Sequence, residues 1–138
     1  MKKPLLKPAH CVISVADMQE SIDWYIKMLG LELLFREYIE PLECEVAFLK
    51  MGDFGVKLFR HRNTIPSSAG KVDPSRDLQT QGLKHVCYEV DDIAAIFADL
   101  RAKGAEIVSG PIPMPDGAVI GFIRDNSGNL MEMVQRNS

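Results

Sequence analysis

Two histidines, a glutamate and a lysine are spaced along this 138-residue chain in a way that suits metal chemistry. His10 and His85 are 75 positions apart, and the same 75 positions separate Lys57 from Glu132. Imidazole nitrogens and carboxylate oxygens bind divalent transition metals, and two histidines with one carboxylate leave coordination positions open for a substrate. A protonated lysine cannot bind a cation and repels it, so the candidate metal ligands are His10, His85 and Glu132.

Lys57 and Glu132 are also the catalytic candidates, because each carries a group that could move a proton. A neutral Lys57 amine could act as a general base, and a charged one could bind a substrate carboxylate or oxyanion. Lys57 could instead extend its ammonium into solvent and take no part in the chemistry. Without a metal, Lys57 would pair with Glu132 and take the place of the cation.

The offset of 75 also relates two longer segments, which indicates an internal repeat. The segments HCVISVADMQESIDWYIKMLG and HVCYEVDDIAAIFADLRAKG begin at His10 and His85, and their apolar residues coincide at helical spacing. Each predicted helix has an aspartate as N-cap, Asp17 or Asp92, and ends near a glycine. The later segments GVKLFRHR and LMEMVQRN align at the same offset.

We therefore predict two copies of one βαβββ module, residues 8–62 and 82–136, in a single α+β domain that spans residues 1–138. A polar linker over residues 63–81 joins them and is long enough to act as a binding lid. The strands are expected near Pro8–Val15, Leu31–Tyr38, Glu45–Met51, Gly55–Arg62, Leu83–Val90, Ala105–Val108, Ala118–Arg124 and Asn129–Arg136.

Alternation along these strands places the ionisable residues on the faces opposite their apolar neighbours. His10, Lys57, His85 and Glu132 all lie away from the faces that are expected to pack on helices. Two modules related by a pseudo-twofold axis would turn these four residues toward one cavity. The same alternation suggests the substrate-binding candidates, which are Lys57, Phe59, His61, Cys87 and Phe122. His61 could instead be a solvated residue at the end of a strand. Cys87 could be only a small residue of the cavity wall.

Composition excludes several kinds of partner. The net charge is −3 and no cluster of Lys and Arg stands out, which argues against nucleic acid. No segment has the length and hydrophobicity of a membrane span or signal peptide, so we expect no membrane partner and a cytoplasmic location. The three cysteines lie far apart without a CxxC motif, as free thiols do in a reducing compartment.

Three segments, HCVISVADMQESIDWYIKMLGLELL, GLKHVCYEVDDI and FIRDNSGNLMEMVQ, resemble the vicinal-oxygen-chelate superfamily. This superfamily includes glyoxalase I, methylmalonyl-CoA epimerase, extradiol dioxygenases, and fosfomycin- and bleomycin-resistance proteins. The resemblance implies paired modules that form an open, cupped eight-stranded sheet around a metal in a central cavity, and a homodimer. It also implies ligands at His10, position 57, His85 and Glu132. Lys57 departs from the family pattern, because glyoxalase-like members have Glu there and epimerase-like members have Gln or Glu.

The leading functional hypothesis is an enzyme with one divalent metal, which could be Fe, Mn, Ni, Co or Zn. It would carry out lyase or isomerase chemistry on a small carbonyl or hydroxy-acid substrate bound to that metal. Lys57 argues against conversion of a glutathione hemithioacetal. One alternative is an Fe(II)-dependent extradiol dioxygenase that uses the two-His-one-Glu set, and another is a metal-free binding or drug-resistance protein. The sequence leaves open the substrate, the metal, and whether the site forms within one chain or across a dimer.

Overall fold

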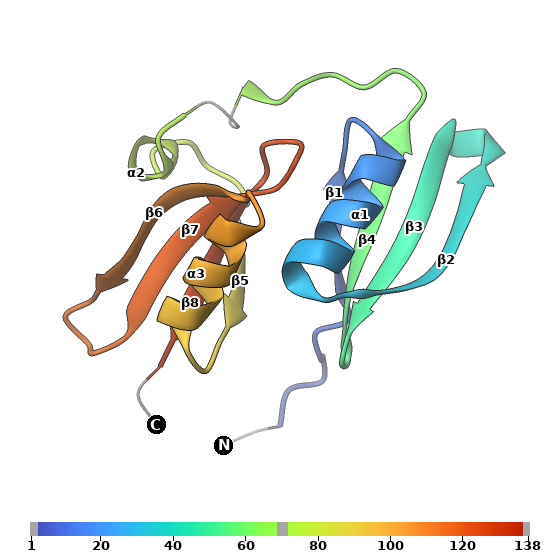
Figure 1. The fold of residues 1–138 in the computed structure, drawn as a ribbon. Helices are drawn as coiled ribbons and strands as arrows, with labels where there is room; N and C mark the ends of the chain where they lie inside the picture. Colours follow the sequence, from blue (N-terminus) through green and yellow to red (C-terminus); the bar gives the residue numbers. More distant parts are fainter. Residues whose placement is uncertain (1–2, 69–71, 137–138) are drawn as a thin grey trace. The chain divides into compact units, whose positions relative to one another are not determined.

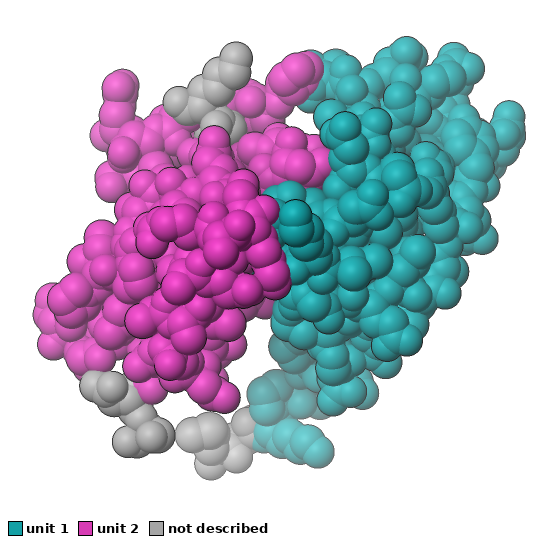
Figure 2. Space-filling model, in the orientation of Figure 1, with its two compact units in different colours: residues 1–65 teal, residues 66–138 magenta. Residues whose placement is uncertain are grey.

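The computed structural model describes residues 3–68 and 72–136, and the chain divides into two compact units. Unit 1 is residues 1–65 and unit 2 is residues 66–138, shown in teal and magenta in Figure 2. Each unit contains one four-stranded sheet and a helix of ten or more residues. Among the described residues, no helix is long and apolar enough to cross a membrane.

Unit 1 is a complete βαβββ module (Figure 1). Its sheet has the order β1-β4-β3-β2, in which β1 runs parallel to β4 and the other pairs are antiparallel. A short 3-10 helix, η1, follows β2. The elements are β1 (His10–Ser14), α1 (Met18–Leu29), β2 (Glu32–Ile39), η1 (Glu40–Leu42), β3 (Cys44–Met51) and β4 (Phe54–His61).

Unit 2 repeats this topology, with the sheet order β5-β8-β7-β6 and a parallel pair formed by β5 and β8 (Figure 1). Its elements are α2 (Pro74–Asp77), β5 (Val86–Glu89), α3 (Ile93–Ala102), β6 (Glu106–Pro113), β7 (Val119–Arg124) and β8 (Leu130–Gln135). The prediction of tandem βαβββ modules with an open and not a barrel-like arrangement of strands is therefore confirmed; the eight strands of the predicted sheet form two four-stranded sheets.

Both long helices begin at the predicted aspartates. An Oδ1 atom of Asp17 accepts a hydrogen bond from the backbone N–H of Glu20 at 2.9 Å, and Asp92 does the same for Ala95 at 3.1 Å. Each bond satisfies one of the amide donors that the first turn of a helix leaves without an intrahelical acceptor. Gly30 ends α1 at φ 71°, a left-handed conformation that glycine adopts without steric cost.

Strand alternation separates a buried face from a more accessible face in each sheet. In unit 1, Val56 and Leu58 are fully buried on the face that α1 covers, whereas Lys57 between them is only half-buried. In unit 2, α3 lies so close to β7 that a Cβ added at Gly121 would come within 2.3 Å of the Phe97 ring. These apolar contacts fix which side chains remain on the opposite, chemically available face.

The predicted linker over residues 63–81 contains a short helix. Residues Pro74–Asp77 form α2, which begins because Asp73 accepts hydrogen bonds from the backbone N–H groups of Ser75 and Arg76. Residues 69–71 of the linker lie outside the described residues. Strand β5 begins at Val86 and not at Leu83, so His85 directly precedes the strand.

Candidate functional site

The predicted ligands of unit 2 lie in direct contact. His85 Nε2 is 3.0 Å from Glu132 Oε1, and both side chains are about four-fifths buried, with exposed fractions of 22% and 19%. The carboxylate projects from β8, where Glu132 pairs with Cys87 of β5 on one side and with Phe122 of β7 on the other. The predicted shared face of β5 and β8 thus brings these two ligands together.

Two further features describe the surroundings of the His85 imidazole. Its ring meets the Phe122 ring edge to face, with centroids 5.3 Å apart and planes at 88°. Its Nδ1 atom is buried and has no hydrogen-bond partner among residues 3–68 and 72–136. The Nε2 atom is therefore the ring nitrogen that this unit directs at a carboxylate.

Cys87 of β5 lies beside Glu132 of β8. Partial burial, and then the negative charge of Glu132, raise the pKa of the Cys87 thiol to about 11. The thiol is therefore protonated at neutral pH, and Cys87 is a neutral neighbour of Glu132. A sulfur ligand at this position would first have to lose that proton.

In unit 1, His10 and Lys57 are on adjacent strands and share one face. In the register of β1 on β4, His10 lies opposite Gly55 and Val12 lies opposite Lys57. Lys57 is therefore the diagonal neighbour of His10, two residues along β4 from Gly55. The Lys57 Nζ atom lies 5.4 Å from the centre of the Phe59 ring, within the range of a cation–π contact. Phe59 thus holds the ammonium along the sheet face.

The structure places His61 apart from this group, at the end of β4. Its Nδ1 atom accepts a hydrogen bond from the backbone N–H of Asn63 at 2.9 Å. Its Nε2 atom lies 3.9 Å from a carboxylate oxygen of Glu43, and the side chain is 41% exposed. These contacts support the alternative reading of His61 as a solvated residue at the strand end, where it holds the turn that follows.

Phe48 of β3 lies on the same sheet face as His10 and Lys57, and it was not among the predicted site residues. It pairs with Lys57, and its ring meets the His10 ring edge to face at 5.7 Å and 80°. Unit 1 therefore has a histidine–phenylalanine pair like the His85–Phe122 pair of unit 2. The alternation in CEVAFLKM could have indicated Phe48, since it puts Phe48 on the face opposite Ala47 and Leu49.

The His85–Glu132 pair has the spacing that two neighbouring metal ligands need. Two donor atoms bound at about 2.1 Å, at right angles around one cation, lie about 3 Å apart. The pair therefore fits half of a metal site, although no group of three such ligands gathers within the described part of the chain. The third predicted ligand, His10, belongs to unit 1, and its part in a metal site stays a prediction.

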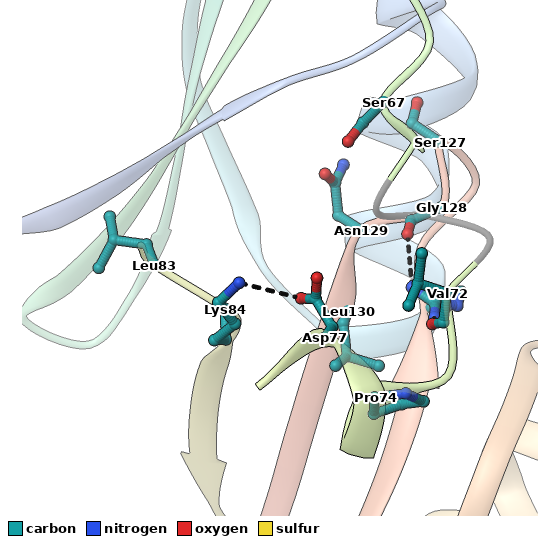
Figure 3. Close-up of a pocket in the computed structure, with 11 residues that line it drawn as sticks. Ser67, Val72, Pro74, Asp77, Leu83, Lys84, Ser127, Gly128, Asn129 and Leu130 are labelled. Atoms are coloured by element: carbon teal, nitrogen blue, oxygen red, sulfur yellow. Dashed lines mark hydrogen bonds and ion pairs between the residues drawn. The ribbon is translucent and has the colours of Figure 1, made fainter. Parts of the chain in front are cut away.

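A separate cavity of about 190 Å³ lies in unit 2 next to α2 (Figure 3). Its charged lining is already paired, because Lys84 Nζ is 3.3 Å from Asp77 Oδ2. Arg124 donates hydrogen bonds to the backbone oxygens of Gly128 at 3.0 Å and Val72 at 2.9 Å. Lys84 thus ties α2 to the segment before β5, and Arg124 of β7 ties Val72, two residues before α2, to the sheet. The cavity contains none of the predicted site residues.

Replacing Arg124 by Met is expected to lower the free energy of unfolding by about 2 kcal/mol, as measured by urea denaturation. The two carbonyl oxygens would lose a charged donor that is only 9% exposed. The control is Arg136→Met, which removes an exposed ion pair to Glu89 and should cost less than about 1 kcal/mol. Equal losses in the two variants would contradict the anchoring role of Arg124.

The two βαβββ modules agree with the comparison of the whole chain against protein families. The model of the Glyoxalase/Bleomycin resistance protein/Dioxygenase superfamily matches residues 7–133. The chain belongs to this superfamily. The family resemblance predicted from the three sequence segments is therefore confirmed.

Relatives within the superfamily include lactoylglutathione lyases. One from Arabidopsis thaliana is 29% identical over 140 residues, which cover 98% of this chain and 46% of the relative. A probable lactoylglutathione lyase from Synechocystis is 28% identical over 130 residues, 94% of this chain and 95% of the relative. The chain thus spans less than half of the plant relative and nearly all of the cyanobacterial one.

Solved structures of superfamily members share the fold. Glyoxalase I from Zea mays superposes with a TM-score of 0.77 at 25% identity, over 96% of this chain and 45% of that one. A glyoxalase family protein from Bacillus cereus superposes with a TM-score of 0.78 at 21% identity, over 99% and 98% of the two chains. The second likeness concerns the fold alone.

Proposed function

We propose that this chain is a divalent-metal-dependent enzyme with lyase or isomerase chemistry on a small carbonyl or hydroxy-acid substrate. The observation that carries the proposal is the His85–Glu132 contact of 3.0 Å between two largely buried side chains. His10, which the repeat makes equivalent to His85, would supply the third ligand from the same chain or from a second copy in a homodimer. The lactoylglutathione lyases among the relatives support this class of activity.

The bound cation would polarise a substrate oxygen and so make a neighbouring C–H bond more acidic. Glu132 would hold the cation through its charge, while His85 is kept in orientation by Phe122. Lys57 is the proton-handling or anion-binding group of unit 1, because its ammonium lies half-buried along the sheet face beside Phe59. Apolar rings beside these groups would exclude water from the reacting atoms.

Lys57 sets this chain apart from the glutathione-specific members of its superfamily. With an ammonium at position 57, the site has lost one negative charge and gained a donor for a substrate anion. We propose that the substrate carries its own carboxylate or oxyanion for this reason. The same two-His-one-Glu set also suits Fe(II), so an extradiol-type dioxygenase is the second candidate.

Metal analysis of the protein, purified without added metal, tests the proposal. About one equivalent of Mn, Ni, Co or Zn per chain is the result expected for a lyase or isomerase. About one equivalent of iron would favour the dioxygenase. A protein that contains no metal and binds none when it is added would contradict both enzymes, and would favour a metal-free binding protein in which Lys57 pairs with Glu132.

A further inference from the structure

The Phe48 ring is at the centre of two aromatic contacts on the open face of the unit 1 sheet. On one side it stacks on Phe35 of β2, with centroids 5.7 Å apart and planes at 7°. On the other side it meets the His10 ring edge to face at 5.7 Å. A row of rings thus extends from the edge strand β2 to β1, and the histidine is its last member.

Gly55 of β4 makes room for this ring. A Cβ atom added at Gly55 would lie 2.4 Å from Phe48 Cζ, a distance that real side chains do not tolerate. The backbone φ of Gly55 is not in the left-handed region, so glycine is needed here for space and not for conformation. The same Cβ would approach His10 Cβ at 3.1 Å. Gly55 therefore lies under both members of the His10–Phe48 contact.

The internal repeat gives the contact a counterpart. In unit 2 the Phe122 ring meets the His85 ring at 5.3 Å and 88°, close to the 80° of the His10–Phe48 pair. In both units the phenylalanine also lies opposite the candidate site residue of the module's last strand. Phe48 pairs with Lys57 of β4, and Phe122 pairs with Glu132 of β8. The residue at this place differs between the modules, lysine in one and glutamate in the other, whereas the histidine and its aromatic neighbour occur in both.

We infer that Phe48, seated on Gly55, is a positioning residue that orients the His10 imidazole for metal binding. That His10 is a metal ligand rests on the proposed function. The contacts that orient its imidazole are made within unit 1 alone. An exposed histidine at the start of a strand would otherwise sample several rotamers. The edge-to-face contact favours one of them and so reduces the entropy lost when a metal binds.

NMR spectroscopy of the metal-free protein tests the orientation, because the chain has only three histidines. Replacing Phe48 by Ala should displace the chemical shifts of the His10 ring protons and leave those of His61 in place. Tyr38→Leu is the matched control, since Tyr38 is an aromatic residue of β2 in the same sheet, is 50% exposed and pairs with Glu45, on the face opposite Phe48. If Phe48→Ala fails to fold, Phe48→Leu serves instead. Unchanged His10 shifts in a folded variant would overturn the inference.

A double-mutant comparison tests the part played by Gly55. Gly55→Ala alone should displace the Phe48 ring and therefore shift the His10 signals. Once Phe48 is replaced by Ala, the same Gly55→Ala change should have little further effect. An equal effect of Gly55→Ala with and without the ring would overturn the inference, because the added methyl would then act on His10 directly.

Zinc titration of the same variants connects orientation to binding. Phe48→Ala should weaken Zn²⁺ binding about tenfold, as loss of a group that orients a metal ligand does, whereas Tyr38→Leu should leave it within about twofold. A Phe48→Ala variant with shifted His10 signals and unchanged zinc affinity would contradict the positioning role. If the unsubstituted protein binds no Zn²⁺ or other divalent metal, the proposed function is overturned, while the NMR shifts alone still decide whether Phe48 orients His10.

Discussion

Replacing Glu132 by Gln should weaken divalent-metal binding at least about 100-fold, as measured by competition with a chelator of known affinity. Glutamine keeps the shape of the side chain but removes the charge that attracts the cation. Changing a residue that only supports a metal ligand lowers metal affinity roughly 10- to 100-fold. Removing the charge of a ligand itself should lower the affinity further. His85, 3.0 Å away, would keep a hydrogen-bonding neighbour, so the fold should be retained.

Glu89→Gln is the matched control for this experiment. Glu89 is in β5, its side chain is 65% exposed, and its ion pair within the described part of the chain is with Arg136, which is no candidate ligand. Its neutralisation should change metal affinity by less than about threefold, since exposed charges are screened by solvent and salt. Equal effects of the two substitutions would mean that Glu132 acts only through the overall charge of unit 2.

Replacing Lys57 by Glu should strengthen metal binding roughly 10- to 100-fold. The substitution restores the carboxylate that glyoxalase-like members have at this position, and removes an ammonium that would repel the cation. The same change should lower turnover about 10²- to 10⁴-fold if Lys57 moves a proton or binds the substrate anion. Metal affinity and activity would then change in opposite directions.

Lys57→Met and Lys27→Glu show whether metal affinity rises because the ammonium is removed, because a carboxylate ligand is added, or because the net charge of the protein changes. Lys57→Met removes the ammonium without adding a ligand, so we expect a smaller gain in metal affinity and the full loss of turnover. Lys27→Glu makes the same change of charge on the exposed surface of α1 and should alter neither quantity. Unchanged metal affinity in Lys57→Glu would show that Lys57 is not equivalent to Glu132, and the alignment of the modules at β4 and β8 would be wrong.

The repeat in the sequence predicted the two βαβββ modules correctly. Alternation along a strand is a local property, so the sequence alone could place His85 and Glu132 on the faces opposite the buried side chains. Their 3.0 Å contact is in line with that prediction. The caps at Asp17 and Asp92 were predictable for the same reason, because each bond joins residues three positions apart.

Contacts across the sheet could not be predicted in this way. Phe48 meets His10 because the register of β3 on β4 and of β4 on β1 sets both side chains beside Gly55. Register depends on how the whole module packs, and no short window of sequence records it. His61 shares the alternation of Lys57 but is turned toward Asn63 by the loop that follows β4.

The sequence by itself therefore determined the duplication, the eight strands and the two long helices, and the alternation of side chains between the faces of each strand, because periodicity and capping act over a few neighbouring residues. The tertiary structure decided which of these residues meet. It paired His85 with Glu132, gave His10 and His85 an aromatic neighbour each, and tied Val72 to Arg124 across 52 positions of the chain. Such contacts form only when strands distant in sequence take up one register, which the burial of the whole apolar face selects.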